Sequence, residues 1–145
     1  MAAGEDIAPR VATLHTVMAD QSVPEWQSVL TAVQELDHVG PGPIGYLGVS
    51  MGSGLGIPFL AAEPRVRAAV LGLAGSVGLT EAAAQLTIPI QFLVQWDDAL
   101  VPRTQALDLF DTFASPAKTL DANPGDVPRF ETDNALRFFT RNFTD

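Results

Sequence analysis

The sequence contains no cysteine and only one lysine, and both shortages exclude classes of protein. Without cysteine there is no disulfide, no thiolate nucleophile and no zinc site built on sulfur. Lys118 is the only lysine and the formal net charge is -9, so no basic surface is available to neutralise phosphates or to bind an anionic membrane. We therefore expect no nucleic acid and no membrane among its partners.

Long apolar runs are also missing. No run approaches the roughly 18 residues of a membrane span, and the opening residues 1–6 lack the basic and apolar regions of a signal peptide, so we expect a cytoplasmic protein. Of the 145 residues, 47% are hydrophobic and 17% charged, which is typical of an α/β domain with a buried parallel sheet. We predict one domain over residues 1–145, with an N-terminal helical segment (1–40) followed by an elbow and C-terminal β/α units (41–145).

Hydrophobic periodicity predicts the elements of this domain. Apolar residues at helical spacing predict a helix over residues 7–18, and the capping box that starts at Ser22, with Pro24 in the first turn, predicts a second helix that reaches Leu36. Short apolar runs predict strands over residues 44–47, 66–73, 88–96 and 118–122. Further helices are expected up to Ala62 and over residues 80–86, 103–113 and 129–143. The alternation predicts an α/β fold with a parallel sheet of about four strands and flanking helices.

The segment Gly48-Val49-Ser50-Met51-Gly52 matches the pattern G-x-S-x-G between a predicted strand and a predicted helix. In a nucleophile elbow, Gly48 and Gly52 would avoid collisions as strand and helix close up, and Ser50 would be held out as the nucleophile. The N–H of Met51, at the helix N-terminus, would receive an oxyanion. The alternative interpretation is a glycine-rich turn that carries a serine by chance.

Three segments carry a resemblance to a known family: residues 46–52, 67–72 and 89–102. In sequence and in order they resemble bacterial α/β-hydrolases of the dienelactone-hydrolase-like and small-esterase kind. The resemblance covers roughly residues 24–143 and corresponds to the C-terminal half of that fold, so it implies a truncated α/β-hydrolase fold. It further implies hydrolysis of small carboxylic esters through an acyl-enzyme, with no metal or organic cofactor. Residues 98–102 fit the family pattern D-x-x-V-P, which makes Asp98 the expected acid of the triad.

The catalytic histidine of such relatives follows the last strand, where this chain has Asn123-Pro124-Gly125-Asp126-Val127-Pro128 instead. Only His15 and His38 are present, and His38 is expected to cap a helix C-terminus. His15, supplied by a partner subunit, is therefore the candidate base. The alternative function is a catalytically impaired α/β-hydrolase-like domain that serves as a dimerising or binding module. Because the strand before the elbow would form an exposed sheet edge, we predict a homodimer.

Overall fold

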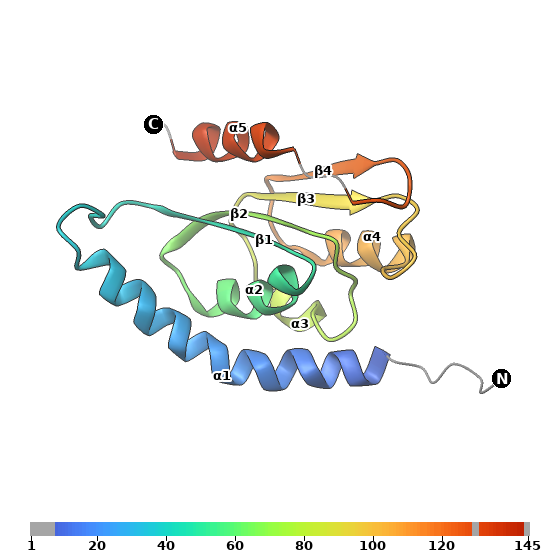
Figure 1. Cartoon of the computed structure of the whole chain (residues 1–145), viewed down its shortest axis with the longest axis horizontal. Helices are drawn as coiled ribbons and strands as arrows, with labels where there is room; N and C mark the ends of the chain where they lie inside the picture. Colours follow the sequence, from blue (N-terminus) through green and yellow to red (C-terminus); the bar gives the residue numbers. More distant parts are fainter. Residues whose placement is uncertain (1–7, 129–130, 144–145) are drawn as a thin grey trace.

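A four-stranded parallel sheet forms the centre of the computed structural model, which describes residues 8–128 and 131–143 (Figure 1). The strands are β1 (Ile44–Val49), β2 (Val66–Gly72), β3 (Ile90–Gln95) and β4 (Lys118–Asn123), and they lie in the order β1-β2-β3-β4. Each neighbouring pair is parallel, as expected where crossovers with helices connect consecutive strands. The predicted α/β fold class, with about four strands and flanking helices, is confirmed.

Helices cover both faces of the sheet (Figure 1). On one face lie α2 (Met51–Ala62), α3 (Thr80–Ala83) and α4 (Arg103–Thr112), and α1 (Ala8–Gln34) packs against α2; α5 (Thr132–Phe143) covers the other face. Successive strand residues point to opposite faces, so Leu71 and Phe92 join the larger core. Their neighbours Val70 and Leu93 lie in the smaller core beneath Phe138 of α5.

α1 is one continuous helix of 27 residues, so the predicted break at Ser22 is wrong. The Ser22 hydroxyl does not cap a new helix but donates to the carbonyl oxygen of Met18 one turn earlier, at 2.7 Å. Pro24 lies inside the helix, although it removes one backbone hydrogen bond and usually breaks a helix. Packing explains its tolerance, because Ala19 on one side of Pro24 is buried and Trp26 on the other packs against the core.

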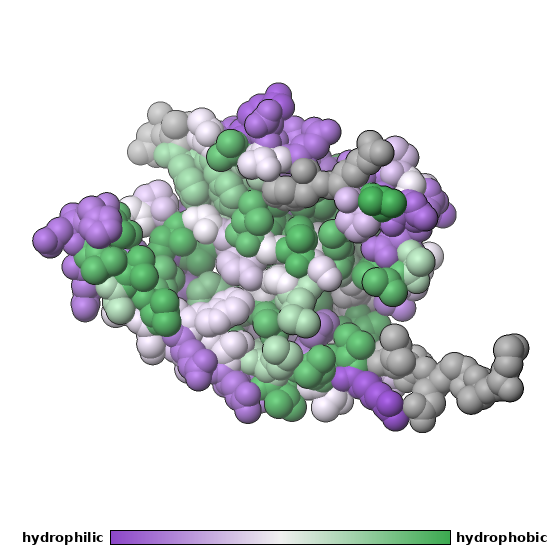
Figure 2. Space-filling view, viewed as in Figure 1, coloured by the Kyte–Doolittle hydropathy of each residue, from purple (hydrophilic) through white to green (hydrophobic). Residues whose placement is uncertain are grey.

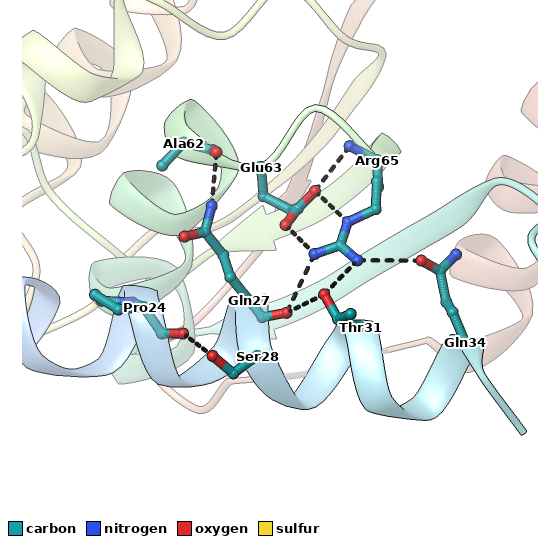
Figure 3. A network of polar contacts seen from close by, with 8 residues as sticks. All are labelled: Pro24, Gln27, Ser28, Thr31, Gln34, Ala62, Glu63 and Arg65. Atoms are coloured by element: carbon teal, nitrogen blue, oxygen red, sulfur yellow. Dashed lines mark hydrogen bonds and ion pairs between the residues drawn. The ribbon is translucent and has the colours of Figure 1, made fainter.

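An ion pair at the end of α2 anchors the C-terminal half of α1 (Figure 3). The guanidinium of Arg65 donates to both carboxylate oxygens of Glu63, at 2.7 Å each, and also to the Gln27 carbonyl, the Thr31 hydroxyl and the Gln34 side chain. The hydrogen bond from Arg65 holds the pKa of the buried Glu63 below its ordinary value. These hydrogen bonds join α1 to Arg65, which precedes β2, and through Arg65 to Glu63, which follows α2, and they fix α1 to the rest of the fold.

Element ends differ from the predictions by a few residues, as is usual at such ends. α3 stops at Ala83 and not at residue 86, because the chain continues in tight turns in which Leu86 N–H donates to the Ala83 carbonyl. β3 starts at Ile90 and not at residue 88, since Pro89 has no N–H for the ladder. Residues 7 and 129–130, which were predicted to be helical, lie outside the described residues.

β1 is an edge strand that pairs only with β2 in the described part of the chain. Its Leu47 side chain is 48% exposed, and a groove of about 460 Å³ between β1 and α1 is lined by apolar side chains that include Trp26, Leu30 and Ile44. Figure 2 shows hydrophobic side chains gathered over the C-terminal part of α1 and the neighbouring β1. No charged residue protects this edge, since β1 reads Ile-Gly-Tyr-Leu-Gly-Val.

Candidate active site

The predicted elbow lies where β1 ends and α2 begins. Ser50 separates the two elements and adopts φ 54° and ψ -119°, a backbone conformation that an L-residue adopts only under strain. Its N–H donates to the Gly72 carbonyl of β2 at 2.9 Å, and its own carbonyl accepts from the N–H groups of Ser53 and Gly54 in the first turn of α2. The Ser50 side chain is left exposed at the carboxyl edge of the sheet.

Two side chains that the sequence reasoning overlooked hold this turn in place. The buried Ser53 hydroxyl lies 2.8 Å from the carbonyl oxygens of Gly48 and Gly72 and accepts from the Gly72 N–H at 2.9 Å, so it links β1, β2 and α2. The Tyr46 hydroxyl donates to the Gly52 carbonyl at 2.7 Å, and burial raises the pKa of this phenol. The strained serine is therefore supported by hydrogen bonds on both sides.

Only one of the two elbow glycines, Gly48, lies where a side chain would collide with its surroundings. A Cβ on Gly48 would lie 2.8 Å from the Gly52 carbonyl and from the Tyr46 ring, so a side chain there collides as expected. A Cβ on Gly52 would meet nothing within 4 Å. The predicted steric requirement is correct for Gly48 and wrong for Gly52, because the first turn of α2 faces open space at that position.

Ser50 lies on the wall of a cavity of about 450 Å³ at the carboxyl edge of the sheet. The rest of the wall comes from the N-terminal half of α1, the loop of residues 73–77 after β2, the loop of residues 100–102 before α4, and Gln105 of α4. Parallel strands present their carboxyl ends at one edge, which is where α/β folds place their ligands. Met51 also lines the cavity, and its N–H is among the first donors of α2, which have no carbonyl one turn earlier to bind.

His15 lies on the same cavity wall as Ser50, in the same chain. Its ring packs against Gly54 of α2, one turn after Ser50, where a Cβ would approach Nε2 to 2.6 Å. Partial burial lowers the pKa of this imidazole. Its Nδ1 is buried and has no hydrogen-bond partner among residues 8–128 and 131–143. The fold therefore places an imidazole and the candidate nucleophile of the same chain on the wall of one cavity.

The other candidate site residues, His38 and Asp98, do not line the cavity. His38 is exposed in the turns that follow α1, four residues beyond its last helical residue, Gln34. Asp98 follows β3 as predicted, and its Oδ1 accepts from the N–H groups of Leu100 and Val101 at 2.7 and 3.1 Å. Asp98 thus shapes the loop that forms one cavity wall, while Asp97 accepts from the Gly125 N–H at 3.1 Å and joins the ends of β3 and β4.

The loop after β4, where the family resemblance implies a histidine, is held by hydrogen bonds from a side-chain amide. The side chain of the buried Gln95 donates to the carbonyls of Pro124 and Gly125, at 2.9 and 2.7 Å. Trp96, the residue that follows β3, lies neither on the cavity wall nor in the buried core. It is 41% exposed, and the guanidinium of Arg103 lies 4.4 Å from its ring centroid.

No group of three or more His, Asp or Glu side chains that could hold a metal ion occurs within residues 8–128 and 131–143. None of the helices in this part of the chain combines the length and the apolar character that crossing a membrane requires.

Comparison with known proteins gives matches among solved structures alone. No protein-family model matches the chain, and no curated protein matches it. The native structure of a cold-adapted esterase from an Arctic intertidal metagenomic library is 34% identical, with a TM-score of 0.74 over 82% of this chain and 57% of that chain. The zinc-bound structure of such an esterase from the same source is 32% identical, with a TM-score of 0.81 over 97% of this chain and 66% of that chain.

A mouse protein, alpha/beta hydrolase domain-containing protein 10, shares the fold at 19% identity, with a TM-score of 0.55 over 82% of this chain and 67% of that chain. The predicted resemblance to α/β-hydrolases is therefore confirmed. The chain has an α/β-hydrolase-like fold, and it spans between 57 and 67% of the length of these similar proteins.

Proposed function

We propose that this protein is a serine hydrolase that cleaves small carboxylic esters through an acyl-enzyme on Ser50. The observation that carries the proposal is the strained backbone of Ser50, φ 54° and ψ -119°, in a strand-to-helix turn that opens on a cavity with an imidazole in its wall. A strained backbone persists only where the surrounding contacts hold it, and strained residues are concentrated at active sites and ligand-binding sites. The similarity to an esterase at 32 to 34% identity supports the same reaction class.

In the proposed mechanism, the Ser50 hydroxyl oxygen attacks the ester carbonyl and its proton passes to His15. The N–H of Met51 donates to the oxyanion that forms on the carbonyl oxygen, and the positive end of α2 favours the negative charge. The protonated imidazole then returns the proton to the departing alcohol. Water, deprotonated by His15, cleaves the acyl-enzyme and restores Ser50.

The family pattern makes Asp98 the candidate for the carboxylate that stabilises the imidazolium, and this part of the proposal rests on the pattern alone, because no hydrogen bond joins Asp98 to the His15 Nδ1 within residues 8–128 and 131–143. The Oδ1 of Asp98 is engaged with the loop, so this function would fall to its other carboxylate oxygen. The substitution Asp98→Asn separates the two roles, because asparagine keeps an acceptor for the Leu100 and Val101 N–H groups and loses only the charge. A fall in kcat with unchanged thermal stability would support the role in catalysis, while an unchanged kcat would leave Asp98 as a loop residue.

The decisive experiment measures hydrolysis of p-nitrophenyl butyrate by the wild type and by Ser50→Ala, His15→Gln and His38→Gln. We expect Ser50→Ala and His15→Gln each to abolish most of the rate. His38→Gln is the matched control, because its exposed side chain lies outside the cavity, and it should leave kcat unchanged. Equal rates for the wild type and Ser50→Ala would remove the proposal.

The second candidate function is a catalytically impaired domain that binds or dimerises. The observation in its favour is the loop of residues 123–128, which carries no histidine where relatives have theirs. An alkyl fluorophosphonate discriminates between the two functions, because it labels only an activated serine. Stoichiometric labelling of Ser50, located by peptide mass spectrometry and lost in His15→Gln, would support the hydrolase. The absence of labelling in the folded protein would support the binding module.

A further inference from the structure

The cavity beside Ser50 is lined mainly by apolar side chains. Leu73, Ala74 and Val77 come from the loop after β2, and Leu100, Val101 and Pro102 from the loop before α4. The polar side chains are few: Ser50 and His15 at the candidate reaction centre, and Gln105 on α4. None of the lining residues is Lys, Arg, Asp or Glu, so nothing in the wall would pair with a charged group on a ligand.

α1 supplies one side of this cavity. Val11, Leu14 and Met18 lie three and four residues apart, so they form a single stripe on the helix, and all three line the cavity together with His15. The next apolar residue on the helix surface, Val17, does not line it, although Val17 and Leu14 are equally exposed, at 49% and 48%. α1 therefore forms one side of the cavity.

We infer that this cavity is an acyl pocket for uncharged aliphatic chains, with α1 as the wall that selects them. The inference rests on the proposed function, because the chain enters the cavity as the acyl group on Ser50. Esters whose acyl group ends in a carboxylate are excluded, since the cavity holds no cation to receive them and the chain as a whole carries a net charge of -9.

Chain length gives the first test, with p-nitrophenyl acetate, butyrate, hexanoate and octanoate as substrates. Full burial of a methylene contributes about 0.8 kcal/mol, so kcat/KM should rise by up to about fourfold for each methylene that enters the cavity. The mono-p-nitrophenyl ester of adipic acid matches the hexanoate in length and ends in a carboxylate, and its kcat/KM should be more than about tenfold lower. A flat series, or a preferred adipate ester, would overturn the inference.

The contribution of α1 is tested by Leu14→Asp with Val17→Asp as its matched control. Both changes place a carboxylate on the same helix at the same exposure, but only Leu14 lines the cavity. We expect Leu14→Asp to lower the ratio of octanoate to acetate kcat/KM by about tenfold or more, because the apolar chain would have to strip water from the new charge. Val17→Asp should leave the ratio unchanged, and equal effects of the two variants would refute the role of α1.

A binding measurement separates this inference from the proposed function. The sequence has three methionines, and Met18 and Met51 both line the cavity. With methyl-labelled methionine in the Ser50→Ala variant, octanamide should shift the NMR signals of the Met18 and Met51 methyl groups, whereas acetamide at the same concentration should not. Shifts without any turnover in the wild type would reject the hydrolase and keep the apolar site. Turnover with neither shifts nor chain-length dependence would keep the hydrolase and reject the acyl pocket.

Discussion

The substitution Gly54→Ala tests the placement of His15 more directly than removal of the imidazole does. A Cβ on Gly54 would lie 2.6 Å from Nε2 of His15. Atoms in contact prefer about 3.5–4.0 Å, so the ring must retreat by roughly 1 Å. A displacement of about 1 Å at a reacting centre costs on the order of a hundredfold in rate, so we expect kcat for p-nitrophenyl butyrate to fall by about that factor.

Stability should change far less than the rate. Alanine is more favourable than glycine inside a helix by about 1 kcal/mol, and this gain offsets part of an overpacking cost of about 1–3 kcal/mol. Urea denaturation should therefore show a loss of at most about 2 kcal/mol in the free energy of unfolding. The protein stays folded under assay conditions, so a lower kcat reports the position of the ring.

Gly52→Ala is the matched control on the same helix. A Cβ on Gly52 meets no atom within 4 Å, so kcat should stay close to that of the wild type, and the free energy of unfolding should stay the same or rise by up to about 1 kcal/mol because alanine is favoured in a helix. A folded Gly54→Ala protein with wild-type kcat would refute His15 as the base. If Gly52→Ala lost as much activity as Gly54→Ala, the effect would belong to the elbow and not to the imidazole.

Three further predictions concern the pKa of His15, the Glu63–Arg65 ion pair and the exposed edge of β1. Burial lowers the pKa of His15 in the free protein from its ordinary value of 6.5, so the acid limb of kcat/KM should lie below pH 6.5; a limb at or above 6.5 would contradict this. Arg65 lowers the pKa of Glu63, so the pair stabilises the fold above the ordinary carboxyl value of 4.5, and this contribution is lost as the pH falls through the folded-state pKa. Glu63→Gln should therefore lower the thermal midpoint at pH 7 and lessen its further fall on acidification, whereas an equal fall in wild type and variant would refute the role of the pair. We also propose a homodimer through the uncharged edge of β1, for which light scattering should give twice the mass of the chain, and a monomer at micromolar concentration would contradict it.

Patterns of neighbouring residues in the sequence were sufficient to predict the elbow and the sheet. Strand, tight turn and small-residue helix follow one another around Ser50, and this order alone predicted a residue with an unusual backbone between β1 and α2. The two buried strands were visible as apolar runs, because β2 and β3 have nearly every side chain covered by helices. The predicted strand ends were less accurate, because hydrogen bonding to the neighbouring strands, and not composition, determines where a strand begins and ends.

Tertiary contacts decided what the local rules missed. The capping box at Ser22 and Pro24 is a valid helix start in an isolated segment, but burial of Ala19 and packing of Trp26 keep the helix continuous. The open space at Gly52 depends on which elements lie nearby, and no pentapeptide pattern contains that information. Ser53 could have been found, because a serine in the first turn of a helix that lies against two strands must satisfy its hydroxyl.

The continuity of α1 explains how a histidine early in the chain lines the same cavity as Ser50. A helix of 27 residues spans about 40 Å, long enough to reach from the Arg65 contacts to the carboxyl edge of the sheet. Arg65 binds Gln27, Thr31 and Gln34 near one end of α1, and His15 lies more than two turns nearer the other end. Had the helix broken at Ser22, the N-terminal segment would have lost this anchorage, and His15 would have depended on its own contacts with Gly54 for its position. The sequence analysis predicted that a partner subunit supplies His15, whereas the continuous α1 carries the His15 of the same chain to the cavity wall that Ser50 also lines.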